Sequence, residues 1–149
     1  MYIPFLLFHL LPFTLALSAT PGPATFPSSP TWTLSKFYAL TTPTESSASF
    51  IFQDHGPLSS NIITLECEVG NPIYRNTFTA CGPGLDLLFK LSEGDVILRR
   101  TYRLPNGRRV TGIAAQSTYW TEANRTSGDD WDQYTRTEDW YFPVATIIG

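Results

Sequence analysis

Two cysteines, Cys67 and Cys81, are the only ones in the chain, and each lies in or beside a stretch typical of a β-strand. From Ile63 to Val69 apolar and polar side chains alternate strictly, with Cys67 in the apolar set. A period of two over this run predicts a strand with one buried face and one solvated face. Thirteen residues separate the cysteines. A disulfide between neighbouring strands is therefore expected, and closing a loop of that size stabilises a fold by about 3 kcal/mol.

An apolar leader over residues 1–19 indicates the compartment. It contains no Lys, Arg, Asp or Glu and ends in small residues. The run is too short to span a membrane, and Pro4 and Pro12 interrupt any long helix. We interpret residues 1–19 as a signal peptide, with a buried N-terminal helix as the alternative. We predict a secreted, extracellular protein with no membrane anchor, and an oxidising compartment agrees with a bridge between Cys67 and Cys81.

The rest of the chain is long enough for one domain. Residues 20–31 are rich in Pro, Ser and Thr and are predicted to be a disordered linker, followed by a β domain over 32–119 and an acidic aromatic tail over 120–149. No stretch has helical periodicity, and Asn106-Gly107 is a strong hairpin signal. The fold class predicted is all-β: a compact antiparallel β-barrel or sandwich of about seven strands with one disulfide. The expected strands lie near 32–40, 48–53, 63–69, 76–81, 85–91, 96–104 and 109–119.

Few residues could carry catalysis. His55 is the only histidine outside the leader. Metal sites usually combine several His or Cys ligands, so with both cysteines in a disulfide we expect no metal and no cofactor. Glu66 and Glu68 share one face of a strand, and paired carboxylates can hydrolyse glycosides, but that face is more simply read as solvated. We predict a non-enzyme. The alternative is a small secreted hydrolase or ribonuclease that uses Glu66 or Glu68, His55 and an arginine converging in one cleft.

Arginines gather between residues 99 and 109, where Arg99 and Arg103 could form a basic edge around one hairpin. No Phe or Trp alternates with these arginines as a platform for nucleobases, so we interpret them as solvated outer faces, with a binding role as the alternative. The net charge is only -3. Composition therefore gives no reason to expect nucleic acid or a membrane surface as a partner.

The tail is aromatic as well as acidic. Trp120, Trp131 and Trp140 either cover an open end of the sheet or form a recognition surface, and packing is the preferred interpretation because large exposed aromatic patches are uncommon on soluble monomers. Asn124-Arg125-Thr126 matches the acceptor triplet for N-glycosylation, so Asn124 is a candidate glycosylation site.

Several segments occur in an order that resembles a known family. They are Trp32–Tyr38, Ile63–Cys67, Phe78–Gly82, Leu87–Leu91 and Val96–Arg100. Over about residues 32–119 this order resembles the fungal secreted family typified by the major Alternaria allergen. The resemblance implies a compact antiparallel β-barrel, secretion by a fungus, and an allergen-like or effector-like role without established catalytic residues. It also implies an intradomain disulfide between Cys67 and Cys81. The chain lacks the further cysteines that many members carry, so the resemblance does not extend to a second bridge or a disulfide-linked dimer.

These inferences together predict a binding protein that acts at the host interface. The resemblance implies two partner classes, a host defence protein and a small apolar, phenolic ligand. We expect a monomer or a non-covalent dimer, since the only two cysteines are assigned to the internal bridge.

Overall fold

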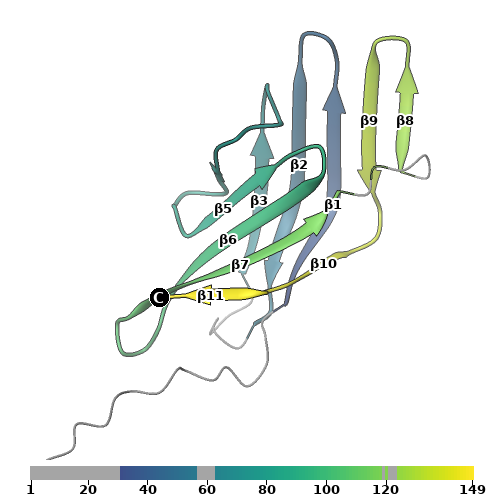
Figure 1. Ribbon diagram of the computed structural model, residues 1–149. Coiled ribbons are helices and arrows are strands. Elements are labelled where there is room, and N and C mark those ends of the chain that lie inside the picture. The colour runs from purple at the N-terminus through teal and green to yellow at the C-terminus, as the bar shows by residue number, and fades with distance from the viewer. Residues whose placement is uncertain (1–30, 57–62, 119, 121–123) are drawn as a thin grey trace, which may run out of the picture.

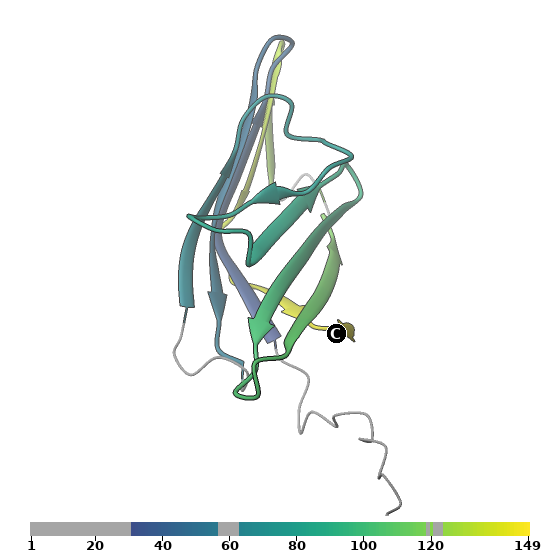
Figure 2. The same ribbon diagram turned by 90° about the vertical axis from the view of Figure 1, so that its left-hand side faces the viewer.

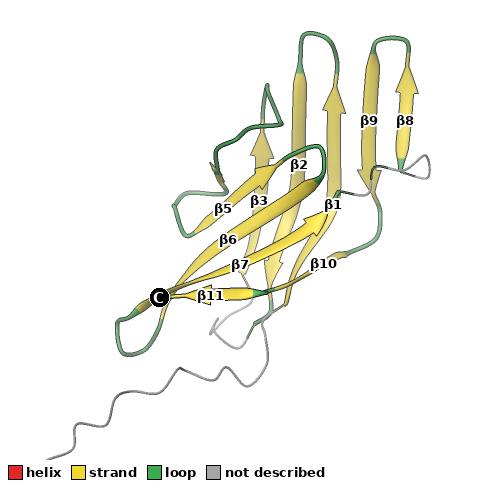
Figure 3. Ribbon diagram, viewed as in Figure 1, coloured by secondary structure: helices red, strands yellow, loops and turns green. Residues whose placement is uncertain are grey.

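The computed structural model describes residues 31–56, 63–118, 120 and 124–149. Within these residues the chain forms eleven strands and no helix (Figure 3). This part of the chain accordingly offers no helix with the length and hydropathy needed to cross a membrane. The predicted signal peptide, and all of the predicted linker except Thr31, lie outside the described residues.

The described strands pair into two antiparallel sheets that lie face to face (Figure 1, Figure 2). The first sheet has the order β3 (Ile63–Val69), β2 (Ser46–Asp54), β1 (Thr31–Thr41), β9 (Trp131–Arg136) and β8 (Arg125–Gly128), and β10 (Trp140–Pro143) also pairs with β1. The second has the order β11 (Thr146–Ile148), β7 (Arg109–Ser117), β6 (Asp95–Arg103), β5 (Leu87–Leu91) and β4 (Thr79–Ala80). No ladder joins the two sheets among the described residues, so the all-β prediction is confirmed in its sandwich form.

The described chain has more strands than the seven or so expected from its sequence. The additional ones, β8 to β11, all come from the acidic aromatic tail. Most of them lack a clear alternation: every residue of β8 is exposed and Tyr134 is the one buried residue of β9, while the short β10 alternates, with Trp140 and Phe142 buried. Their positions are set instead by pairing with distant strands, since β9 and β10 pair with β1 and β11 pairs with β7. The end of the chain therefore completes both sheets.

Strand β1 changes partner at a bulge. Its first half pairs with β10 and its second half with β9, and its register against β2 shifts between Ser35 and Tyr38. Lys36 has a φ of 52°, in the left-handed region that side chains rarely adopt. The extra residue at a bulge re-aims the side chains that follow. As a result, both halves of β1 bury the same face, which carries Trp32, Leu34, Phe37 and Ala39.

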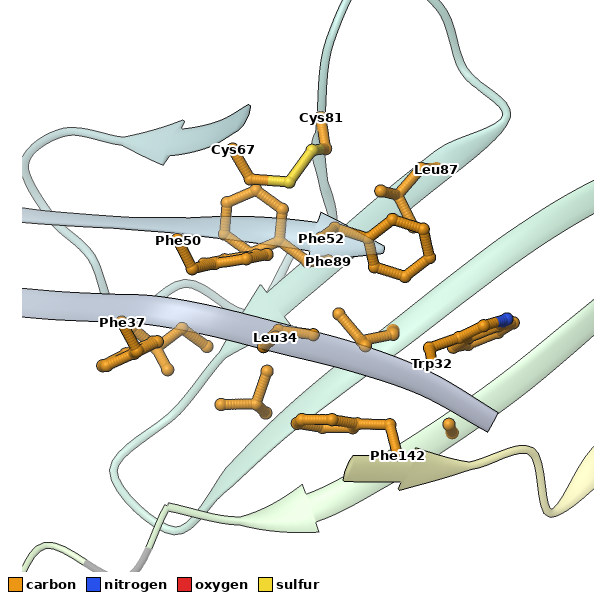
Figure 4. Close-up of a cluster of buried hydrophobic side chains, with 14 of the residues drawn as sticks. Trp32, Leu34, Phe37, Phe50, Phe52, Cys67, Cys81, Leu87, Phe89 and Phe142 are labelled. Carbon is orange, nitrogen blue, oxygen red and sulfur yellow. A yellow bond between two sulfur atoms is a disulfide. The ribbon is translucent and has the colours of Figure 1, made fainter. Parts of the chain in front are cut away.

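Aromatic side chains from both layers fill the space between the sheets (Figure 4). Phe50 and Phe52 share the inner face of β2, as the alternation predicts. The ring of Phe50 meets Phe89 of the second sheet edge-on, with 5.0 Å between the centroids. Pairs of this kind contribute about 0.5–1.5 kcal/mol beyond the area they bury. The core therefore links the two layers directly through ring contacts.

The two sides of the sandwich are closed by different means. On one side the disulfide between Cys67 of β3 and Cys81, which follows β4, is present as predicted (Figure 4). It does not join neighbouring strands of one sheet as expected, because β3 lies at the edge of the first sheet and β4 at the edge of the second. The bridge is thus a covalent link between the layers where no backbone ladder connects them.

On the other side the chain itself crosses between the layers. Strand β10 pairs within the first sheet and β11 within the second, and the buried Val144 lies between them. The crossing packs closely against Gly112 of β7, where an added Cβ would lie 3.1 Å from both Val144 Cγ1 and Trp32 Cζ2. Such a distance is tighter than ordinary van der Waals contact between carbons. Glycine at this position therefore allows the layers to approach.

Candidate functional site

A pocket of about 250 Å³ opens between the sheets, beside the disulfide. We call it the inter-sheet pocket. Its walls are mainly apolar, and three polar residues complete them. The lining residues are Ile63, Leu65, Cys81, Pro83, Gly84, Asp86, Leu87, Arg100 and Thr101. They come from β3, β5 and β6 and from the segment between β4 and β5.

The sequence pattern of β3 explains the apolar wall. Its alternation predicts that Ile63, Leu65, Cys67 and Val69 face inward. Cys67 and Val69 are buried, whereas Ile63 and Leu65 are only half-buried. Ile63 and Leu65 lie near the start of the edge strand β3, where the second sheet does not cover the inner face of the strand. Ile63 and Leu65 therefore belong to the inward-facing set of β3 but line the inter-sheet pocket instead of packing in the core.

One lining residue of the pocket, Arg100, belongs to a buried ion pair. Arg100 Nε lies 2.9 Å from Asp54 Oδ2, and the two side chains are 7% and 0% exposed. The guanidinium carbon of Arg100 also lies 5.0 Å from the centroid of the Tyr102 ring. Breaking a buried pair of this kind leaves an uncompensated charge in a low-dielectric interior. Asp54 therefore holds Arg100 in place at the pocket.

Further hydrogen bonds fix the position of Asp54. The Tyr102 hydroxyl donates to Asp54 Oδ2 at 2.9 Å, and the backbone N–H of Gly56 donates to Oδ1 at 2.7 Å. The indole N–H of Trp32 in turn donates to the Tyr102 oxygen at 2.8 Å. Burial, and then the negative charge of Asp54, raise the pKa of Tyr102 well above its ordinary value. The phenol therefore stays protonated and remains a hydrogen-bond donor.

The mouth of the pocket is polar at one border. Asp86 Oδ1 accepts from Arg109 at 3.3 Å, and both side chains are more than half exposed. The backbone N–H of Thr101 donates to the Asp86 carbonyl at 2.7 Å, which ties the segment before β5 to β6. Leu85, inside the strand expected over residues 85–91, is 76% exposed, because the strand begins only at Leu87. An exposed apolar side chain therefore lies next to the pocket lining in sequence.

The predicted basic edge lies elsewhere. Arg99 and Arg103 are on the outer face of β6, because Leu98, Arg100 and Tyr102 occupy the inner face. Arg103 is exposed, and Arg99 is half-buried with its guanidinium carbon 5.0 Å from the centroid of the Phe78 ring. Neither residue lines the inter-sheet pocket.

The three tryptophans of the tail have different environments. Trp140 is buried, and its ring centroid lies 5.7 Å from that of Phe37. Trp120 is half-buried and packs on Tyr134 with 4.4 Å between centroids. Trp131 is 39% exposed. The three side chains therefore do not form one exposed aromatic surface.

The groups predicted for a hydrolase or ribonuclease are not brought together. Glu66 and Glu68 are exposed on the outer face of β3. Glu66 is paired with Ile51, so four residues along β2, or about 13 Å at strand spacing, separate its register position from His55. The two arginines of the basic edge, Arg99 and Arg103, lie on β6, in the other sheet. The convergence that this alternative requires is absent for these residues. In addition, among the described residues no three His, Cys, Asp or Glu side chains are placed to hold a metal ion.

Asn124 is half-buried and immediately precedes β8. Its backbone carbonyl accepts from the N–H of Thr135 at 3.0 Å, while Arg125 and Thr126 of the same triplet are exposed. Glycosylation of Asn124 stays a prediction.

Sequence reasoning missed Asp54, Arg100 and Tyr102 as a group. A signal was present: Asp54 follows Phe50 and Phe52 at a spacing of two, and Arg100 follows Leu98 at the same spacing. A charged residue at a position of a strand that otherwise carries inward-facing apolar side chains either turns toward solvent or has a buried partner. Opposite charges in that position on two strands are the pattern of a buried pair.

No family model matches the chain, and no curated protein matches its sequence. Solved structures match it in fold. One is a crystal structure of the Alternaria alternata allergen Alt a 1, with a TM-score of 0.54 at 14% sequence identity, covering 85% of this chain and 95% of that chain. Another, of the major allergen Alt a 1 of the same organism, gives a TM-score of 0.50 at 14% identity and covers 77% of this chain and 92% of that chain. The two-layer architecture and these matches lead to the conclusion that the chain has an Alt a 1-like fold.

Proposed function

We propose that this is a secreted, non-enzymatic, allergen-like or effector-like protein that binds a small apolar, phenolic ligand in the inter-sheet pocket. The pocket carries the proposal, because it combines apolar walls from Ile63, Leu65 and Leu87 with a few polar groups, including Arg100. Small-molecule sites have this composition. Drug-sized ligands occupy pockets of about 300–1,000 Å³. At about 250 Å³ the inter-sheet pocket suits a ligand of one or two rings.

The polar groups of the lining suit a phenol. The arginine side chain donates hydrogen bonds through its N–H groups and accepts no hydrogen bond, so it can bind a phenolic or carbonyl oxygen. Arg100 is held by Asp54 and is nearly fully buried, which keeps its position fixed before a ligand arrives. Fixed groups lower the ordering cost of binding. The apolar walls would hold the ring, and Arg100 would orient its oxygen.

A host defence protein is the other predicted partner class, and the structure supports it less. The hot spots of protein interfaces are enriched in clustered Trp, Tyr and Arg side chains. In the tail, Trp140 is buried and Trp120 half-buried, while the exposed Trp131 and Tyr141 belong to different strands. Both cysteines are in the internal disulfide, so a dimer of this protein would be non-covalent.

We expect saturable binding of 7-hydroxycoumarin, a fluorescent phenol, by the purified mature protein. Leu65→Gln should weaken this binding about tenfold, because a polar amide replaces an apolar wall. Thr64→Gln is the matched control, since Thr64 is exposed and neighbours Leu65 on the same strand. Fluorescence titration measures both variants. Absent saturation, or equal affinity in Leu65→Gln and wild type, would contradict the proposed site.

We also expect the protein recovered from culture medium to lack the leader. Its intact mass should correspond to a chain cleaved near residue 19, with no thiol open to alkylation before reduction and two afterwards. A glycan on Asn124 would appear as added mass removable by an amidase. An uncleaved chain with two free thiols would contradict the proposed compartment.

A further inference from the structure

A second pocket, of about 400 Å³, has a different chemistry from the inter-sheet pocket. We call it the aromatic pocket. It is lined by Thr41, Tyr74, Glu93, Trp120, Asp132 and Tyr134. They supply three aromatic rings, two carboxylates and the hydroxyls of Thr41 and the two tyrosines.

Strand pairing brings the first wall together. Thr41 of β1 and Asp132 of β9 are register partners, and Tyr134 lies two residues from Asp132 on the same face of β9. Trp120 follows β7 and packs against Tyr134 at 4.4 Å between ring centroids. Phe37 supports Trp120 from behind, at 5.5 Å.

The second wall comes from the other layer. Tyr74 bridges to Leu91 at the end of β5, and Glu93 lies in the turn between β5 and β6. Glu93 has no ion-pair partner among the described residues, and it is exposed. Its carboxylate is therefore available to a ligand in the pocket.

The electrostatics of this pocket favour positive charge. Burial raises the pKa of Tyr74, and the nearby carboxylates of Glu93 and Asp132 raise it further. Asp132 already pairs with Arg125 at 2.6 Å, so Glu93 is the carboxylate whose negative charge attracts a cation into this pocket. The ring of Tyr134 already has a cation near it, since the guanidinium carbon of Arg125 lies 5.9 Å from its centroid. Arg125 lines the neighbouring polar pocket at the tips of the hairpins, not the aromatic pocket.

A polar atom inside the pocket also lacks a partner. Thr41 Oγ1 is buried and makes no hydrogen bond within the described part of the chain. Buried polar atoms without a protein partner are rare in folded proteins, and a water, an ion or a bound molecule can supply the missing bond. Thr41 Oγ1 is therefore a polar atom that a ligand in this pocket can bond, whatever the charge of the pocket.

From this arrangement we infer that the aromatic pocket binds a small organic ammonium ion. Aromatic rings attract such cations through their negative faces, by about 0.5–2 kcal/mol for each favourable contact. The carboxylate of Glu93 balances the remaining charge, and Thr41 Oγ1 can bond a hydroxyl or N–H group of the ligand. This site is separate from the inter-sheet pocket and does not depend on the function proposed there.

Calorimetric titration with choline tests the inference on the intact mature protein. The control ligand is 3,3-dimethylbutan-1-ol, which has the shape of choline without its charge. We expect choline to bind at least about tenfold more tightly than the neutral alcohol. Equal affinity for the two ligands, or no heat of binding with choline, would overturn the inference. Tighter binding of Nα-acetyl-lysine amide than of choline would overturn the assignment to a free small ammonium ion.

Variants locate the site. Glu93→Gln and Trp120→Leu should each weaken choline binding about tenfold. Glu68→Gln and Trp131→Leu are the matched controls: they make similar changes at exposed positions outside the aromatic pocket. Because Trp120 packs on Phe37, circular dichroism must show that Trp120→Leu is folded, and Glu93→Gln serves as an independent variant in an exposed turn. Equal losses in the control variants would overturn the location.

Discussion

Replacing Asp54 by alanine is expected to destabilise the protein by about 3–5 kcal/mol. The variant removes the carboxylate that Arg100, Tyr102 and the N–H of Gly56 all contact. Arg100 then remains as a buried cation without this partner, and its desolvation dominates the loss. Urea unfolding followed by circular dichroism measures the change in the free energy of unfolding.

Asp86→Ala is the matched control for Asp54→Ala. Asp86 also pairs with an arginine, but its side chain is 75% exposed and that of Arg109 is 63% exposed. Exposed pairs contribute at most about 1 kcal/mol, because water and salt screen the charges. A loss in Asp54→Ala no larger than in Asp86→Ala would contradict the structural role of the buried pair.

A double variant separates charge from packing at this position. Asp54→Asn with Arg100→Met removes both charges while keeping much of the side-chain volume. Buried ion pairs can often be replaced by uncharged groups with little net cost. We therefore expect the double variant to be more stable than Asp54→Ala. The coupling energy from the double-mutant cycle gives the strength of the interaction.

Loss of the disulfide is expected to cost about 3 kcal/mol in the free energy of unfolding. Cys67 and Cys81 are 14 positions apart, so the bridge restricts a loop of moderate length in the unfolded chain. It also joins the edges of the two layers beside the inter-sheet pocket, where no ladder holds them. Cys67→Ser/Cys81→Ser should therefore lower both stability and binding of 7-hydroxycoumarin.

Unfolding in urea, with and without reductant, measures the effect of the bridge. The double serine variant supplies the control, since reductant should not change its unfolding midpoint. Titration of the double serine variant with 7-hydroxycoumarin, at urea concentrations where it is folded, then tests whether the pocket still binds the ligand. An unchanged midpoint on reduction of the wild type would contradict the expected stabilisation.

Local patterns account for the central strands. The alternation in β2 and β3 places Phe50, Phe52 and Cys67 inside, and all three are buried. The Asn106-Gly107 turn lies between β6 and β7, with Gly107 at a φ of 82°. These features are local because one buried face repeats every second residue, and a tight turn demands particular residues. The disulfide followed from the presence of only two cysteines, both near strands.

The end of the chain shows the limit of local patterns. Strands β8, β9 and β11 bury few of their residues, and β10 alternates over only four residues, which is too short a run to predict a strand. They form because β1 and β7 offer unpaired edges, and a bulge at Lys36 lets β1 pair with both β9 and β10. Sheet pairing between distant segments depends on the whole fold, and a sequence window contains only one of the two partners.

The sequence by itself therefore determined an all-β chain, its central strands and its disulfide, and the ordered segments indicated the Alt a 1-like fold. The tertiary structure alone decided that this fold is an open sandwich and that the bridge joins the two layers. It also brought Asp54 to Arg100 and set Trp120 and Tyr134 beside Glu93. Periodicity records which face of a strand is buried. It does not record which side chain of the other sheet lies opposite that face. Both pockets depend on how the side chains of the two sheets are placed against one another.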